Sequence, residues 1–395
     1  MKFDICVIGG CGHVGLPLAI MLAVKGKNVC IYDTNDANIA VVQSGTIPFF
    51  EEGAEPLLKQ VLKEGRLHFS NKPDVVSESE TAILIIGTPV DEHLNPMFRV
   101  MKKVIDDLLP YFYEGQLLIL RSTVYPGLSK RINDWFCEAG KNIHLSFCPE
   151  RILEGKAIEE LESLPQIISS FTKEGVERSS ELFSLLTKDL IVVEPMEAEL
   201  AKLFTNSWRY MKFAVANQFY MMANDYHLDF YNIYHAMTHN YSRTKDFPRP
   251  GFAAGPCLFK DTMQLAAFNN NNFHLGHTAM LINEGLPNYV VSCLKKEYDL
   301  SEMKVGILGM AFKAESDDIR ESLSYKLKKI LEIEAGLVLC ADPYVKDRSL
   351  VSEETVLQES DIIIIAAPHK RYKQLSIANK KVIDIWNILN RGGKI

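Results

Sequence analysis

The sequence predicts an α/β protein with two Rossmann-like, doubly wound parallel-sheet domains joined by a long central helix. Short continuous apolar runs alternate with amphipathic stretches through about residue 190, and they alternate again after Met303. Runs of this kind are typical of parallel strands buried on both faces, with helices covering the sheet. Between the two regions, residues 197–236 carry apolar side chains at helical spacing and contain no proline, which predicts one or two long helices.

Nine apolar runs mark the expected strands, and we place domain boundaries at 1–196, 197–300 and 301–395. The long apolar face of the middle region favours a dimer surface, with an intramolecular core as the alternative. The C-terminal domain echoes the first, because Asp342 closes its second strand as Asp33 does in the N-terminal domain. The predicted strands are Phe3–Ile8, Val29–Asp33, Ala82–Gly87, Leu117–Ser122, Ile143–Phe147, Val305–Leu308, Leu337–Ala341, Ile362–Ala366 and Val382–Ile385.

Composition narrows the class of protein. A chain of 395 residues exceeds one ordinary core, and 47% hydrophobic with 24% charged residues is typical of globular proteins. The net charge of −7 disfavours a nucleic-acid partner. No apolar run reaches the roughly 18–20 residues that span a bilayer, and Met1 leads directly into a strand. The eight cysteines form no C-x-x-C pair, so we expect no metal site and a cytoplasmic protein without a membrane partner. Cys6, Cys30 and Cys340 lie in apolar runs and should be core residues.

The first apolar run leads into a glycine-rich turn, Gly10-Cys-Gly12-His-Val-Gly15, which opens the apolar stretch Val14–Val24. Gly10 would permit a tight turn, Gly12 the close approach of a pyrophosphate, and Gly15 the packing of helix on strand. The N-terminus of the helix would stabilise the anion. Because Gly9 precedes the motif, the position of its first glycine stays open. The pattern predicts dinucleotide binding, although a methyltransferase or another nucleotide binder has the same kind of turn.

Three further strand ends complete the predicted cofactor site. Asp33 ends the second strand, where a carboxylate would bind the adenosine ribose hydroxyls and repel a 2′-phosphate, which favours NAD over NADP. Gly87-Thr88-Pro89 and Ser122-Thr123 follow two other strands and should lie near the nicotinamide half. For Thr123 the alternative is an N-cap for the helix after Pro126.

A Pro/Gly-rich loop ends at Gly251-Phe-Ala-Ala-Gly-Pro-Cys257-Leu-Phe-Lys260-Asp261, and on its own it could be a plain linker. This segment resembles the catalytic loop of the UDP-glucose/GDP-mannose dehydrogenase family, usually written G-F-G-G-x-C-x-x-K-D. The resemblance covers the whole chain in order. The other matching motifs are the glycine turn, Gly87-Thr88-Pro89-Val90, Arg121-Ser-Thr123-Val-Tyr-Pro-Gly127, Cys148-Pro-Glu150-Arg-Ile-Leu-Glu154-Gly-Lys-Ala157, Glu199-Leu-Ala-Lys202-Leu-Phe-Thr-Asn206, Gly309-Met-Ala-Phe312-Lys313 and Asp317-Asp-Ile-Arg320-Glu-Ser322.

The resemblance implies an N-terminal NAD domain, a central helix that forms a homodimer, and a C-terminal domain that holds a nucleotide sugar. It implies that Cys257 is the nucleophile and that the product feeds surface polysaccharide precursor synthesis. It assigns supporting catalytic roles to Lys202, Asn206, Asp261, Glu150, Glu154 and Thr123. It implies substrate contacts by Lys313, Arg320, Arg151, Ile152, Leu153, Tyr241, Arg243, Gly251 and Phe252, as well as Lys202 and Asn206, and cofactor contacts that add His13 and Val14 to the glycine turn.

The chemistry implied is a four-electron oxidation of a sugar's C6 primary alcohol to a carboxylate. A cysteine thiolate captures the aldehyde as a thiohemiacetal, which is oxidised to a thioester that water hydrolyses. Lys202 and Asn206 lie four residues apart on one helix face, where they would stabilise the thiolate and the oxyanion. Glu150 or Asp261, through a water, is the predicted base for hydrolysis, and Glu154 need not act as Glu150 does.

Several alternatives stay open. Ala253-Ala254 replaces the family's paired glycines, which restricts the loop. Cys148-Pro-Glu150-Arg151 resembles the UDP-N-acetylhexosamine branch and the cysteine loop the UDP-glucose branch, with GDP-mannose a weaker third. A two-electron β-hydroxyacid-type dehydrogenase would use Lys202 and Asn206 without Cys257. An inactive nucleotide-sugar sensor would use Lys313 and Arg320. Residue by residue, Cys257 could be inert, Glu199 and Lys202 a solvated helix pair, and Asp317, Asp318, Arg320 and Glu321 charges around a helix start.

Overall fold

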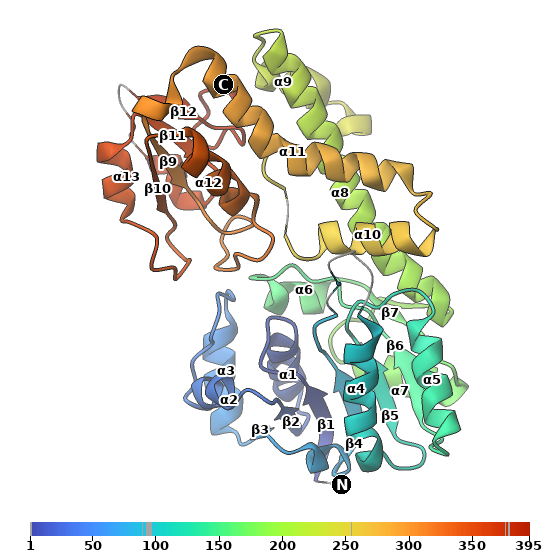
Figure 1. Ribbon diagram of the computed structural model, residues 1–395. Helices are drawn as coiled ribbons and strands as arrows, with labels where there is room; N and C mark the ends of the chain where they lie inside the picture. The colour runs from blue at the N-terminus through green and yellow to red at the C-terminus, as the bar shows by residue number, and fades with distance from the viewer. Residues whose placement is uncertain (1, 89, 92–96, 254, 376, 378–379) are drawn as a thin grey trace. The chain divides into compact units, whose positions relative to one another are not determined.

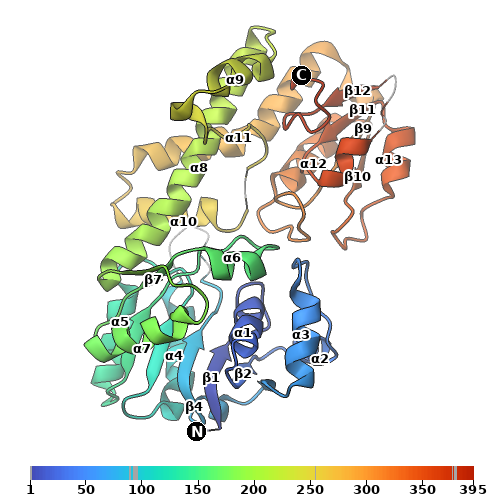
Figure 2. The same ribbon diagram turned by 180° about the vertical axis from the view of Figure 1, so that it is seen from behind.

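The computed structural model describes residues 2–88, 90–91, 97–253, 255–375, 377 and 380–395. The chain forms two compact units, Met1–Phe204 and Thr205–Ile395. Each unit has its own parallel sheet (Figures 1 and 2). Helix α8 (Pro195–Asp225) includes the residues at the division. The predicted fold class, with two Rossmann-like sheets and a long central helix, is confirmed.

The N-terminal unit is built on a six-stranded sheet with the order β3-β2-β1-β4-β5-β6, and every pairing in it is parallel. The order reverses between β1 and β4, which is where open α/β sheets bind ligands beyond the strands' carboxyl ends. A two-stranded parallel sheet lies in the same unit. The strands are β1 (Phe3–Ile8), β2 (Val29–Tyr32), β3 (Leu67–Ser70), β4 (Ser79–Leu84), β5 (Leu117–Leu120), β6 (His144–Phe147), β7 (Gln166–Ile168) and β8 (Leu190–Val192).

Two hydrophobic cores cover the faces of this sheet, because successive strand residues point to opposite sides. Ile5 and Val7 of β1 pack with α1, α3 and α7, whereas Cys6 and Ile8 pack in the core that contains α4 and α5. Figure 1 shows helices on both faces of the sheet. The helices are α1 (Gly15–Val24), α2 (Asp36–Gln43), α3 (Ala54–Lys63), α4 (Phe98–Leu108), α5 (Leu128–Glu138), α6 (Ala157–Ser163) and α7 (Lys173–Ser184).

The segment predicted as one or two long helices forms two. Helix α8 is followed by α9 (Phe230–Thr238), whose first turn is capped by the Asp229 carboxylate accepting from the Tyr231 N–H. Tyr210 and Ala214 of α8 pack on α10 (Leu258–Phe268) and α11 (His274–Glu297) in a core of their own.

The C-terminal sheet has four parallel strands in the order β10-β9-β11-β12. Val305 and Ile307 of β9 face the core shared with α11 and α12, while Leu308 and Ile365 face the core that contains α13. The elements are β9 (Lys304–Leu308), β10 (Leu337–Ala341), β11 (Ile362–Ile365), β12 (Lys381–Ile383), α12 (Leu323–Glu334) and α13 (Glu353–Glu359).

Most differences from the sequence prediction lie at strand ends and edges. The run predicted as Ala82–Gly87 gives a strand that starts at Ser79 and ends at Leu84, so Gly87 follows the sheet as a connection. The edge strand β3 was not predicted, because Leu-His-Phe-Ser has no continuous apolar run. Cys6, Cys30 and Cys340 are buried as predicted. Within the described ranges, no helix is both long and apolar enough to cross a membrane, and no cluster of three His, Cys, Asp or Glu side chains could hold a metal ion.

Candidate active site

The glycine-rich turn after β1 leaves its backbone accessible to a ligand at Gly12. Gly9 has a φ of +75°, and a Cβ there would lie 2.2 Å from the Ile85 carbonyl oxygen, so the left-handed turn falls on Gly9 rather than on Gly10. A Cβ on Gly15 would lie 2.7 Å from the Gly10 Cα, which explains why only glycine fits between helix and strand. A Cβ on Gly12 would meet no atom within 4 Å among the described residues. A pyrophosphate can therefore approach at Gly12, beside the N-terminus of α1.

Asp33 and Ser122 flank this turn at the carboxyl ends of β2 and β5. Asp33 is half-buried, and its Oδ2 accepts from the Cys11 N–H at 3.0 Å. The Ser122 hydroxyl lies 2.8 Å from both the N and the O of Ile86, which joins the ends of β4 and β5. Thr88 follows β4, and Pro89 lies outside the described residues. The glycine turn with a partly exposed carboxylate beside it suits the diphosphate and ribose of a dinucleotide.

The loop that carries Thr123 is held by Glu199, not by a cap from Thr123 itself. The N-cap of α5 is Gly127, with a φ of +88°. The Glu199 carboxylate accepts from the Gly127 N–H at 2.5 Å and from the Ser129 N–H at 2.9 Å. Burial raises the pKa of Glu199, and these hydrogen bonds partly oppose the shift. The alternative interpretations are therefore wrong: Thr123 does not cap α5, and Glu199, which is 1% exposed, is not in a solvated pair.

Glu150 is tied into a buried ion pair. Its Oε2 lies 2.5 Å from Nη2 of Arg121, whose side chain is fully buried and also donates to the Cys148 carbonyl and the Gln166 amide oxygen. The other oxygen, Oε1, accepts from the Arg151 N–H at 2.7 Å and the Ile152 N–H at 3.0 Å. Glu150 thus fixes the start of the segment in which substrate contacts were predicted.

The rest of that segment is held by two more acidic side chains. Glu160 accepts from the Leu153 N–H at 2.5 Å. Glu51 accepts from the N–H groups of Gly155 and Ala157 at 2.9 and 2.6 Å. Glu154 is half-buried and lies in the chain between Leu153, which Glu160 holds, and Gly155, which Glu51 holds. The sequence analysis missed Glu51, because an acidic residue more than 100 positions away in the chain gives no local signal.

In the second unit, Cys257 is exposed and lies at the N-terminal end of α10. One turn further, Asp261 is 1% exposed and accepts from the Asn206 Nδ2 at 2.6 Å. The Lys260 Nζ lies 3.6 Å from the other Asp261 oxygen. Asn206 comes from α8, four residues after the half-buried Lys202. Three predicted residues, Cys257, Asp261 and Asn206, are thus brought together.

A pair of buried asparagines anchors the start of the cysteine loop. Asn217 Oδ1 accepts from the Gly251 N–H at 2.8 Å, and its Nδ2 donates to the Gly251 oxygen and to Asn283. Asn217 follows Tyr210 and Ala214 on one helical stripe, so a polar residue at an apolar position was the available signal. Phe252 is 2% exposed and belongs to the hydrophobic core of the C-terminal unit. Ala254 lies outside the described residues.

The cysteine loop packs on the loop after β9. Gly255 has a φ of +108°, and a Cβ there would lie 2.4 Å from a Phe312 ring carbon. Lys313 follows Phe312, and its Nζ lies 5.8 Å from the centre of that ring. The Arg320 guanidinium makes a bidentate pair with Asp318, which is 7% exposed. Asp318 is therefore the anchor for Arg320, and helix α12 starts later, at Leu323 with Ser322 as its cap.

Two predicted substrate residues lie on the turn after α9. Tyr241 is 48% exposed, and an Arg243 Nη1 lies 3.4 Å from its hydroxyl. The structure brings these two together.

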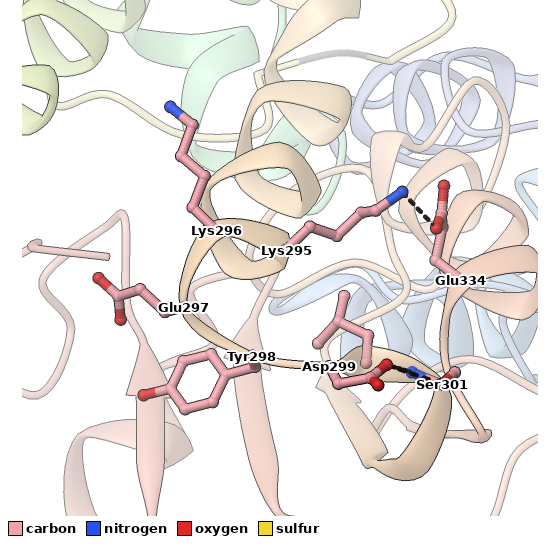
Figure 3. Close-up of a pocket in the computed structure, with 8 residues that line it drawn as sticks. Lys295, Lys296, Glu297, Tyr298, Asp299, Ser301 and Glu334 are labelled. Carbon is pink, nitrogen blue, oxygen red and sulfur yellow. Dashed lines mark hydrogen bonds and ion pairs between the residues drawn. The ribbon is translucent and has the colours of Figure 1, made fainter.

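A hollow near the end of α11, drawn in Figure 3, contains none of the predicted site residues in its described lining. Lys295 pairs with Glu334 there, and the Asp299 carboxylate accepts from the Ser301 N–H. We assign it no function.

The N-terminal sheet with its open glycine turn defines a nucleotide-binding enzyme of the NAD-dependent dehydrogenase class. Three domain models match the chain: the NAD binding domain over residues 3–187, the central domain over 196–285 and the UDP binding domain over 306–391. The chain belongs to the UDP-glucose/GDP-mannose dehydrogenase family. Its cofactor is NAD, and its UDP binding domain indicates a nucleotide-sugar substrate.

Relatives match over almost the full length. A UDP-N-acetyl-D-mannosamine dehydrogenase of Methanocaldococcus jannaschii is 30% identical, with 98% of this chain and 93% of that protein covered. A solved UDP-D-ManNAc dehydrogenase of Pyrococcus horikoshii superposes with a TM-score of 0.90 at 28% identity, covering 97% and 95%. A UDP-glucose dehydrogenase of Pyrobaculum islandicum shares the fold, with a TM-score of 0.89 at 24% identity and coverage of 97% and 94%.

Proposed function

We propose that this protein oxidises the C6 primary alcohol of a UDP-N-acetylhexosamine to the uronic acid, with UDP-N-acetylmannosamine as the first substrate to test. The Cys148-Pro-Glu150-Arg151 segment and the names of the full-length relatives support this branch over UDP-glucose. Cytoplasmic synthesis of surface polysaccharide precursors is part of the same proposal.

The observation that carries the proposal is the arrangement around Cys257. Cys257 is exposed and is the N-cap residue of α10, at the helix end where the dipole favours an anion, and thiolate is the reactive form of cysteine. The buried Asn206–Asp261 pair lies one turn away. A two-electron dehydrogenase or an inactive sensor would have no use for a thiol placed in this way.

Gly12, the N-terminus of α1 and Asp33 would hold NAD⁺, which would supply the hydride acceptor, with a fresh NAD⁺ needed for each of the two hydrides that the oxidation releases. The Cys257 thiolate forms a C–S bond with the aldehyde carbon, and the carbonyl oxygen takes a proton to give the thiohemiacetal. Loss of a hydride and that proton leaves the thioester. Water then adds, the C–S bond breaks, and the products are the carboxylate, the regenerated thiolate and two protons.

Polar side chains would stabilise the charge that develops on oxygen. Lys202 and Asn206 are the proposed oxyanion donors, and losing one such donor typically costs on the order of 10²–10³ in rate. For the hydrolytic water, Asp261 is the first base to test, because it lies on α10 one turn after Cys257 and accepts a hydrogen bond from Asn206. Both Glu150 oxygens are engaged by Arg121 and the loop backbone, which supports a positioning role in this conformation.

A homodimer through the central helix is proposed from an apolar stripe on α8. Trp208, Val215, Phe219 and Met222 are 41–56% exposed, although large apolar side chains usually avoid water. Their spacing places them along one face of the helix.

Purified protein with NAD⁺ and a panel of UDP-N-acetylmannosamine, UDP-N-acetylglucosamine, UDP-glucose and GDP-mannose tests the function by absorbance of NADH. We expect two NADH per sugar and a carboxylate product, with UDP-N-acetylmannosamine fastest. One NADH per sugar would indicate the two-electron dehydrogenase. Binding of UDP-sugars with no NADH would indicate the sensor.

A further inference from the structure

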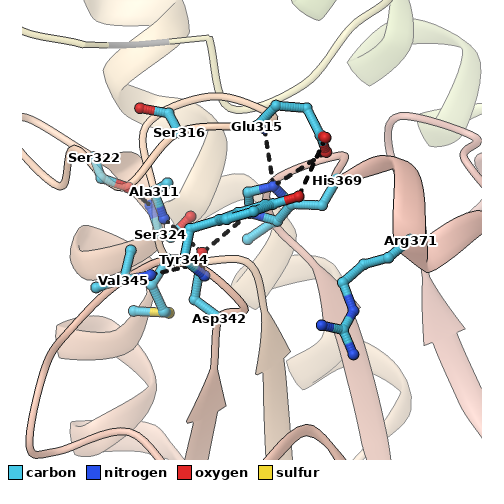
Figure 4. A network of polar contacts seen from close by, with 12 residues as sticks. Ala311, Glu315, Ser316, Ser322, Ser324, Asp342, Tyr344, Val345, His369 and Arg371 are labelled. Atoms are coloured by element: carbon cyan, nitrogen blue, oxygen red, sulfur yellow. Dashed lines mark hydrogen bonds and ion pairs between the residues drawn. The ribbon is translucent and has the colours of Figure 1, made fainter. Parts of the chain in front are cut away.

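A buried carboxylate–imidazole pair lies beside the loop after β9 (Figure 4). Asp342, just after β10, and His369, after β11, both have fully buried side chains, and the His369 Nε2 lies 3.1 Å from the Asp342 Oδ2. Asp342 also accepts four backbone N–H groups, from Met310, Ala311, Tyr344 and Val345. Asp33, at the equivalent strand end, accepts two backbone N–H groups, from Cys11 and Asn35. Asp342 is therefore committed to the protein's own backbone rather than to a ligand.

The His369 imidazole links Asp342 to Glu315, which lies in the middle of the loop after β9. The Glu315 N–H donates to the His369 Nδ1 at 3.0 Å, so Nδ1 has no proton and Nε2 donates to Asp342. The loop that contains Lys313 is thus tied on one side by Asp342, at Met310 and Ala311, and on the other by His369, at Glu315.

The backbone conformation of Glu315 also indicates that the loop after β9 is held in place. Glu315 has a φ of +52°, a left-handed conformation that a residue with a side chain adopts only where its surroundings hold it. Its carboxylate accepts from the Lys370 N–H at 2.8 Å and lies 3.2 Å from the Tyr344 hydroxyl. Figure 4 shows Tyr344, Glu315 and His369 converging. A strained turn with this many contacts two residues after Lys313 is typical of a ligand clamp.

We propose that His369, oriented by Asp342, is a positioning residue that fixes the Glu315 turn and so presents Lys313 to the anionic nucleotide of the substrate. This role depends on the substrate contact proposed for Lys313. Because His369 is fully buried, it acts through the loop and does not touch the substrate.

Two substitutions separate the contacts of His369. His369→Gln can keep a donor to Asp342 but loses the acceptor for Glu315, whereas His369→Asn can keep that acceptor. With UDP as probe in calorimetry, we expect His369→Gln to raise the Kd for UDP and the KM for the UDP-sugar by about 10–100-fold, as when a group that orients a ligand is lost. The kcat and the Kd for NAD should stay near wild type, and His369→Asn should recover part of the loss.

Controls keep the outcomes distinct. Tyr344→Phe removes the hydroxyl contact to Glu315 and should raise the Kd for UDP by a smaller factor, and His274→Gln, at an exposed position, should leave it unchanged. If Lys313→Ala weakens UDP binding but His369→Gln does not, the positioning role is overturned and the proposed function stands. If wild-type protein binds no UDP, or Lys313→Ala binds it normally, the proposed role of Lys313 fails and the positioning role with it. A parallel loss of NAD affinity in His369→Gln would indicate general damage and also overturn the positioning role.

Discussion

Arg121→Met should destabilise the N-terminal unit, because it leaves the Glu150 charge buried without its counter-charge. The Arg121 side chain is 0% exposed and that of Glu150 is 9% exposed. Arg121 also donates to the Cys148 and Gln166 oxygens, and its guanidinium lies 4.6 Å from the Phe183 ring centre. Methionine would fill much of the volume and replace none of the hydrogen bonds.

Breaking a buried ion pair by removing one partner costs about 3–5 kcal/mol. At about 2–4 °C per kcal/mol for a unit of this size, the melting transition of the N-terminal unit should fall by about 6–20 °C. Differential scanning calorimetry without NAD measures the shift, since bound cofactor would stabilise the folded state. Urea denaturation followed by tryptophan fluorescence provides a second estimate.

Two comparisons make this reasoning refutable. Adding Glu150→Gln to Arg121→Met removes the stranded charge and keeps an acceptor for the Arg151 and Ile152 N–H groups, so it should recover at least half of the loss. Lys130→Met breaks the exposed Lys130–Asp134 pair in α5 and should cost less than about 1 kcal/mol. A cost for Arg121→Met as small as for Lys130→Met, or no recovery in the double variant, would refute the argument.

Cys257→Ser should lower acid production by at least about 10³-fold, on the scale of a lost nucleophile, while circular dichroism and NAD binding stay unchanged; normal carboxylate output would contradict the covalent route. Trp208→Glu should shift the protein from dimer to monomer in size-exclusion chromatography with light scattering, whereas Ile333→Glu, 84% exposed on α12, should not. Burial by itself would raise the pKa of Asp342, but the hydrogen bond from His369 and those from the backbone N–H groups lower it overall. A carboxyl with a lowered folded-state pKa contributes stability above the unfolded pKa of about 3.9 and loses it as pH falls through the folded pKa. Asp342→Asn should therefore flatten the acid decline of the C-terminal melting temperature between about pH 5 and 2, and an unchanged decline would contradict this.

The sequence was sufficient for the architecture because its signals are local. The continuous apolar run Ile362–Ile365 predicts a buried strand, and it forms one. The glycine pattern after β1 predicts a tight turn, and the close contacts at Gly9 and Gly15 leave room only for glycine there. Edge strands such as β3 were missed, because half-buried strands need no apolar run. The proposed site residues were found by their motifs, but the anchors that hold them, Glu51 and Asn217, were not.

By itself, the sequence determined the two parallel sheets, the long helix between them, the glycine turn and the kinds of side chain available for chemistry. These depend on spacing along the chain, which the primary structure contains directly. Only the tertiary structure decided that Glu150 pairs with Arg121, that Asn206 donates to Asp261, and that Asp342 is held by His369 and four backbone N–H groups. Such pairings join residues distant in sequence, and burial leaves each charged or polar group stable only where a distant partner satisfies it.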